Sequence, residues 1–161
     1  MKSKLLIMMV MVTGLGFGQI KFKDPVLCEM WDLFETQNYF KLKESFENHK
    51  TQLKEEYRLF YSAMIQKVFI QPESSNRDIE ALLQHHKIED ELMFEVYTAK
   101  LWNHVNLYEY AEAAKASAII QQKYLDFADE DEKENLKNEI KIWQALAQTP
   151  RQEVFKKSDN H

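Results

Sequence analysis

The sequence predicts an all-α fold, and three observations carry that prediction. All three glycines of the 161-residue chain lie at or before Gly18. Only Pro25, Pro72 and Pro150 add further turn signals. Sheets and tight hairpins normally need glycine-bearing turns, whereas apolar residues recur here at helical spacing. We expect about seven helices in antiparallel pairs, arranged as a right-handed solenoid or an irregular bundle.

Capping residues bound the first two predicted helices. Asp24 can cap a helix whose first position is Pro25, and apolar residues continue it to about residue 37. Asn38 then opens a second helix, which ends before residue 48.

The third and fourth helices are separated by the clearest loop in the chain. Residues 52–70 have apolar side chains at helical spacing. Residues 71–75 read QPESS, a composition typical of a loop. Ser75 or Asn76 then opens a fourth helix, which continues through Leu83.

Three more helices complete the predicted fold. The fifth spans residues 89–105, with an apolar stripe formed by Leu92, Val96, Ala99 and Trp102. Asn106 caps the sixth, which continues to residue 119. The acidic run 129–131 suits the positive end of a seventh helix dipole, and Pro150 stops that helix.

Asparagines recur where the second helix of each predicted pair begins. Asn38, Asn76 and Asn106 are separated by 38 and 30 residues, averaging 34. Two helices in about 34 residues resemble a tetratricopeptide repeat. The best copy is the third unit, with Ala99, Trp102, Tyr108, Ala111 and Ala118. The usual glycine and closing proline are missing, so the resemblance is to a degenerate repeat, and a plain irregular bundle is the alternative.

A second resemblance covers residues 142–154, IWQALAQTPRQEV. This run is similar to the junction in exported bacterial retropepsin-like aspartic proteases, where a helical region precedes the protease domain. The resemblance implies an accessory helical region. The chain has neither the Asp-Thr-Gly nor the Asp-Ser-Gly tripeptide that such a protease needs. The protease portion is therefore absent from this chain, or the chain is a free-standing relative of the accessory region.

The N-terminus has the pattern of a signal peptide. An apolar run over residues 5–12 follows a short basic start, and Gly16 and Gly18 occupy positions −3 and −1 of a cut before Gln19. The run is too short to cross roughly 30 Å of hydrocarbon as a helix. We expect export to the periplasm or outside the cell, without stable membrane insertion after cleavage. The predicted organisation is a signal peptide (1–18), a helical-repeat domain (19–150) and a charged tail or linker (151–161).

Composition argues against several classes of partner and chemistry. The chain has 21 basic and 26 acidic residues, a net charge of −5 and no basic stripe, which argues against nucleic acid as a partner. The single cysteine, Cys28, rules out an intramolecular disulfide, and we expect a buried or half-buried thiol. His85 and His86 point about 100° apart on a helix, which does not suit one metal ion. We predict no catalytic residue, no metal site and no cofactor, and hence no enzymatic activity.

Aromatic residues are the remaining candidates for a function. Trp31, Trp102 and Trp143 lie on apolar stripes and are expected in the core. One face of the fifth helix carries Tyr97, Lys100 and His104. We expect these residues to form a mixed aromatic and polar surface that suits a peptide partner. We therefore predict a non-catalytic module that binds a protein or peptide. The alternative is a small bundle of structural role that binds a ligand or a second copy of itself.

Overall fold

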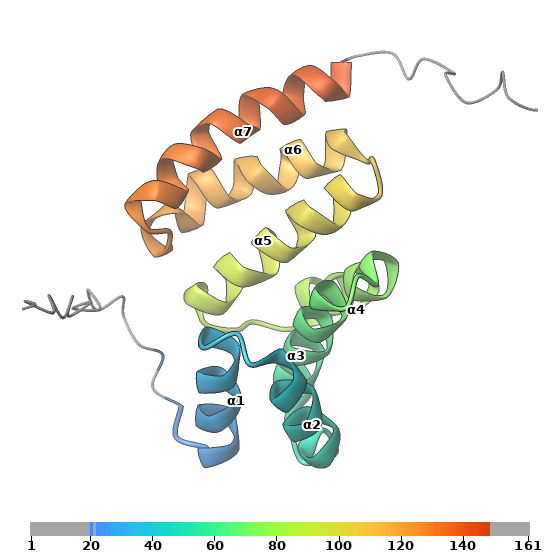
Figure 1. The fold of residues 1–161 in the computed structure, drawn as a ribbon, viewed down its shortest axis with the longest axis vertical. Helices are drawn as coiled ribbons and strands as arrows, with labels where there is room; N and C mark the ends of the chain where they lie inside the picture. The colour runs from blue at the N-terminus through green and yellow to red at the C-terminus, as the bar shows by residue number, and fades with distance from the viewer. Residues whose placement is uncertain (1–19, 21, 149–161) are drawn as a thin grey trace, which may run out of the picture.

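The computed structural model describes residue 20 and residues 22–148, and within them it contains seven α-helices and no strand (Figure 1). The helices are α1 (Pro25–Glu35), α2 (Tyr39–His49), α3 (Glu55–Val68), α4 (Pro72–His85), α5 (Asp90–Asn106), α6 (Tyr110–Ile119) and α7 (Glu130–Gln148). A π-helical turn, η1 (Ile120–Tyr124), and a 3-10 turn, η2 (Leu125–Phe127), connect α6 to α7. Each helix packs against the next one in the chain. The all-α prediction is confirmed, while residues 1–18, Gln19 and residues 151–161 lie outside the described residues.

The odd-numbered helices α1, α3 and α5 end in the same backbone geometry. A residue with positive φ follows each of them: Gln37 (56°), Ile70 (57°) and Tyr108 (59°). The next N–H then donates to the carbonyl five residues earlier, at 2.8–2.9 Å, as in a Schellman motif. The following helix begins two residues after the positive-φ residue. The chain therefore makes three helix–turn–helix hairpins of one design.

Two predicted boundaries are wrong for a shared reason. Residues 71–75 were expected to form a loop, but Pro72 is the first residue of α4 and Asn76 lies inside that helix. Asn106 was expected to cap the sixth helix, but it is the last residue of α5. In both places a non-glycine residue in the left-handed region ends the preceding helix, so the sequence offers no glycine to mark the turn.

Two hydrophobic clusters form the interior, and α5 contributes to both. The first joins α1–α4 to one side of α5, where Leu92, Val96 and Ala99 are buried. The second joins α6 and α7 to another side of α5, where Phe94 and Leu101 are buried. In Figure 1, α5 accordingly lies between the α1–α4 part and the α6–α7 part of the molecule.

The tryptophans and the cysteine only partly follow expectation. Trp31 is buried, as predicted, but Trp102 is 37% exposed and Trp143 is partly buried. Trp102 and Trp143 contact each other edge to face, with centroids 6.2 Å apart. Leu92, Val96 and Ala99 of the predicted stripe are buried, whereas Trp102 is not part of either buried cluster. The thiol of Cys28 is half-buried, as expected, and donates to the Phe22 carbonyl.

Candidate functional site

A groove with a volume of about 460 Å³ is lined by residues of α1, α3 and α5, together with the start of α2 and the segment that leads into α7. Its lining consists of Trp31, Phe34, Glu35, Gln37, Tyr39, Lys67, Val68, Glu91, Phe94, Glu95, Phe127 and Asp129. The first helix of each hairpin thus supplies part of one surface. The volume falls within the range of about 300–1,000 Å³ that is typical of ligand sites.

One wall of the groove is aromatic and rigidly held. The Phe34 ring stacks on Trp31, with centroids 5.4 Å apart, and meets Tyr39 edge to face at 6.3 Å. Phe34 also contacts the fully buried Phe60 of α3. Phe127 of η2 also lines the groove and is 37% exposed. The wall therefore offers ring surface on a support that the core fixes in place.

The groove is also acidic. Glu35, Glu91, Glu95 and Asp129 line it, against the single basic lining residue Lys67. Burial raises the pKa of Glu91, and the charge of Glu35 raises it further. Burial also raises the pKa of the Tyr39 hydroxyl, with a second contribution from Glu95. These shifts report a negatively charged surface that is partly withdrawn from solvent.

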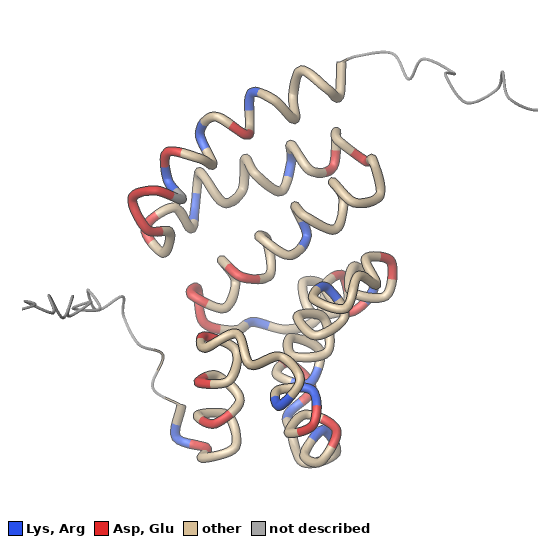
Figure 2. The backbone as a smooth tube through the Cα atoms, viewed as in Figure 1, with Lys and Arg blue, Asp and Glu red and all other residues tan. Residues whose placement is uncertain are grey.

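The acidic residues of the groove come from elements that lie on one side of the fold. Figure 2 shows Asp and Glu together at the start of α5 and at the start of α7, on the side where α1 ends. Glu35 and Glu91 are 56 residues apart in the chain, and they come together because α1 and α5 both border the groove.

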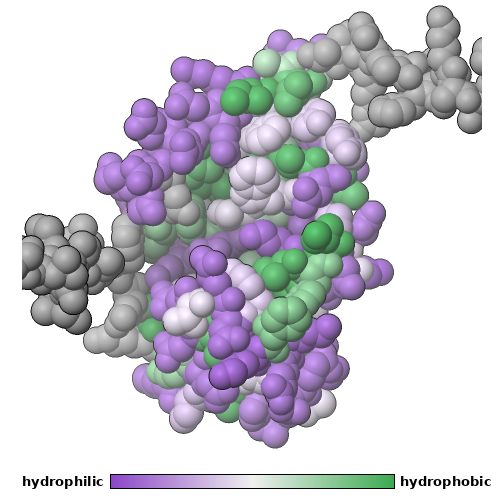
Figure 3. Space-filling model, viewed as in Figure 1, coloured by the Kyte–Doolittle hydropathy of each residue, from purple (hydrophilic) through white to green (hydrophobic). Residues whose placement is uncertain are grey.

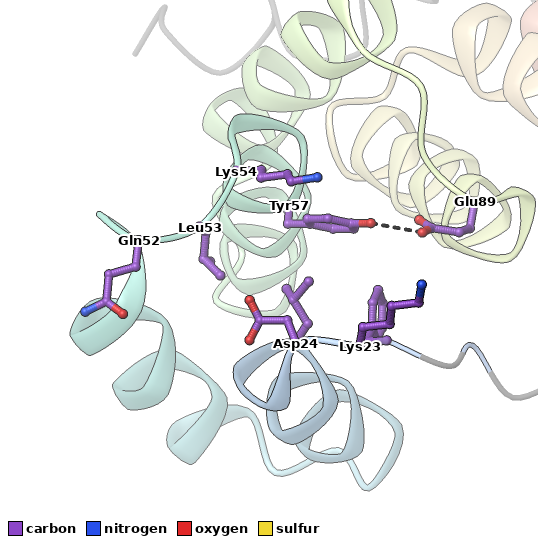
Figure 4. Close-up of a pocket in the computed structure, with 9 residues that line it drawn as sticks. Lys23, Asp24, Gln52, Leu53, Lys54, Tyr57 and Glu89 are labelled. Atoms are coloured by element: carbon purple, nitrogen blue, oxygen red, sulfur yellow. Dashed lines mark hydrogen bonds between the residues drawn. The ribbon is translucent and has the colours of Figure 1, made fainter.

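A second cavity, of about 360 Å³, lies beside the N-terminus of α1 (Figure 4). Three of its polar lining residues, Asp24, Tyr57 and Glu89, already have structural roles. The Tyr57 hydroxyl donates to Glu89 at 2.9 Å, and burial together with this bond raises the pKa of Tyr57 to about 12. Asp24 accepts from the Val26 N–H at 2.9 Å, which confirms it as the cap of α1. We therefore take the groove, and not this cavity, as the candidate site.

The residues predicted from sequence to bind a partner lie on α5 but do not line the groove. Tyr97 stacks on Tyr124 of η1, with centroids 5.6 Å apart. Lys100 forms an ion pair with Glu80 of α4. His104 is only 9% exposed, and its Nδ1 lies 2.7 Å from a Glu109 carboxylate oxygen. Each of these side chains has a different neighbour within the fold, and their binding of a partner stays a prediction.

The groove residues of α5 differ from the binding residues predicted on that helix. Glu91, Phe94 and Glu95 have the spacing of one helix face, but the binding residues predicted on this helix were Tyr97, Lys100 and His104. Residue spacing could have grouped these three, but it could not have placed them opposite Glu35.

Among the described residues, no group of three or more His, Cys, Asp or Glu side chains is arranged to hold a metal ion. No helix in that part of the chain has the length and apolar character to cross a membrane. Comparisons with family models, with curated proteins and with solved structures find no match to this chain.

Proposed function

We propose that this chain is an exported, non-catalytic helical-repeat module that binds a protein or peptide segment in the groove. The observation that carries the proposal is that α1, α3 and α5, the first helices of the three hairpins, all contribute to the groove lining. In helical-repeat proteins, stacked units create an extended concave surface of this kind, which is used for binding.

The repeated hairpin turn supports a tetratricopeptide-like ancestry. The positive-φ residues Gln37, Ile70 and Tyr108 are 33 and 38 residues apart, close to the repeat length expected for two helices per unit. This register replaces the one built on Asn38, Asn76 and Asn106. The repeat is degenerate, because the turns use three different residue types.

Export and a place beside an aspartic protease are part of the same proposal. The signal-like pattern of residues 1–18 supports export, and the run over residues 142–154 supports an accessory role next to a protease domain. A reading frame that continues beyond codon 161 into a segment with Asp-Thr-Gly or Asp-Ser-Gly would support this accessory role.

The groove can be tested by amide chemical-shift mapping on the purified chain, titrated with a mixture of random-sequence peptides. Shifts are expected near Phe34, near Lys67 and in the first turns of α5. Replacing the exposed groove residue in Phe127→Ser should weaken them. The matched control is Phe40→Ser, because Phe40 is 80% exposed and does not line the groove. Shifts confined to α4 and α6, or no shifts at all, would overturn the assignment.

Self-association is the alternative, and a specific surface favours it. Trp102, Tyr108, Ile142 and Leu146 are 37–69% exposed at the ends of α5 and α7 that lie near the α5–α6 turn. Figure 3 shows apolar atoms gathered over the C-terminal end of α7. A second copy of the chain would cover this surface. Light scattering distinguishes the two functions, since a dimer that Ile142→Lys converts to a monomer would favour the alternative.

A further inference from the structure

We propose that the groove recognises its partner through a lysine or arginine side chain, whose cationic head lies between Glu35 and Glu91. The aliphatic stem of that side chain would lie along the aromatic wall. This inference rests on the proposed peptide-binding function and adds the chemistry of the bound segment.

The two carboxylates make the groove complementary to a cation. Glu35 comes from α1 and Glu91 from α5, and neither has an ion-pair partner among the described residues. They are close enough for the Glu35 charge to raise the pKa of Glu91. Glu35 is exposed and Glu91 is partly buried. Two like charges near each other are unfavourable by themselves, and a cation placed between them removes that repulsion.

The aromatic wall selects an organic cation over a small ion. Phe34 lies next to Glu35 in the sequence, and its ring is fixed by Trp31 and Tyr39. A lysine or arginine over an aromatic face gains a cation–π interaction, and its methylene stem can pack on apolar surface. A hydrated metal ion would use the carboxylates and gain little from the rings.

The one basic lining residue does not reverse the negative net charge of the groove lining. Lys67 approaches from α3, whereas the four acidic residues come from α1, from α5 and from the position immediately before α7. A bound cation therefore meets more negative than positive charge. Because part of this surface is withdrawn from water, the attraction is screened less than at an open surface.

Three synthetic peptides that differ at one pair of central positions test the inference. The pair is lysine in the first peptide, glutamine in the second and glutamate in the third, in an otherwise identical framework that contains one tyrosine. Binding to the purified chain is measured by isothermal titration calorimetry at low and high salt. The lysine peptide should bind roughly tenfold more tightly than the glutamine peptide, and high salt should reduce the difference.

Paired variants assign the effect to the groove. Glu35→Gln combined with Glu91→Gln should remove the preference for lysine. Glu44→Gln combined with Glu134→Gln removes the same charge from exposed positions outside the groove and should preserve it. Circular dichroism serves to check that both double variants are folded. Removal of two neighbouring like charges is expected to stabilise the variant that carries Glu35→Gln and Glu91→Gln.

The outcomes separate this inference from the proposed function. Equal binding of all three peptides, unaffected by the Glu35 and Glu91 changes, would overturn the cationic preference while peptide binding stands. Binding of calcium ions alone, in place of the lysine peptide, would also overturn it. Failure of every peptide to bind, together with no response to random-sequence peptides, would overturn the proposed function and this inference with it.

Discussion

Glu91 is a residue at which the charge proposed for binding lowers the stability of the fold. Its carboxylate is partly buried beside the Glu35 charge, and both effects raise its pKa above the ordinary value of 4.5. A carboxyl group with a raised pKa in the folded state favours folding when it is protonated and disfavours folding when it is ionised. The contribution of Glu91 to folding stability is therefore fully present in acid. It falls as the pH rises above 4.5 and passes through the raised pKa.

Glu91→Gln should raise the free energy of unfolding at neutral pH, because it removes the ionised group while keeping the side-chain shape. The gain should be about 0.5 kcal/mol or less, the size of an interaction between partly exposed charges. It should disappear when the pH falls below the ordinary carboxyl pKa. Urea unfolding of the variant and the unmodified chain at both pH values measures this, with the exposed Glu134→Gln as control. A variant that is less stable at neutral pH would mean that Glu91 is held by a cation in the folded chain.

The three helix endings show that packing between neighbouring helices can hold a strained backbone conformation. Ile70 follows α3 with φ of 57°, although a β-branched residue is rarely found in the left-handed region. Its side chain is 77% exposed, so little burial compensates for the strain. The turn persists because α3 and α4 pack against each other and because the Gln71 N–H donates to the Gln66 carbonyl at 2.9 Å.

Ile70→Gly should therefore stabilise the protein. Left-handed geometry costs a non-glycine residue about 1–2 kcal/mol, while glycine costs about 0.5–1 kcal/mol through its greater freedom in the unfolded chain. We expect a net gain of roughly 0.5–1 kcal/mol, measured by chemical denaturation. Ile70→Ala, which keeps a Cβ, is the control and should not give this gain. A loss of stability in the glycine variant would show that the isoleucine side chain makes contacts that outweigh its backbone strain.

The whole molecule is built from two cores of unequal size that share α5. Among the described residues, the first cluster has fifteen buried members, including Phe60 and Tyr61, and the second has seven, of which three are alanines. Less apolar surface is buried around α6 and α7, so that part of the molecule should open at lower free energy than α3 and α4. The groove residue Phe127 lies on the weaker side, and the Phe34 wall lies on the stronger side.

Hydrogen exchange on two matched leucine variants tests this division. Leu82 of α4 is 1% exposed in the first cluster, and Leu136 of α7 is 8% exposed in the second. Leu82→Ala should lower the global free energy of unfolding by about 2–5 kcal/mol. Leu136→Ala should speed exchange in α6 and α7 while α3 and α4 stay protected. Equal loss of protection in all helices for both variants would show one cooperative unit in place of two.

Local signals were sufficient for part of this structure. Asp24 followed by Pro25 predicted the start of α1 correctly, because the cap and the first helical residue are adjacent in the chain. The start of α6 was missed, because Glu109 carries no recognised capping role and α5 is extended through Asn106 by packing. Of the groove, the sequence indicated that helix five had polar positions, but it favoured Tyr97, Lys100 and His104 over Glu91 and Glu95.

The sequence by itself determined that the regular elements among the described residues are helices, since helical periodicity and the lack of glycine after Gly18 are properties of neighbouring residues. Tertiary structure alone decided where α3 and α5 end, because left-handed isoleucine and tyrosine are tolerated only when packed helices hold them. It also decided that Glu35 and Glu91 line the same groove, because that depends on how α1 and α5 are placed around a shared core and not on any short-range pattern.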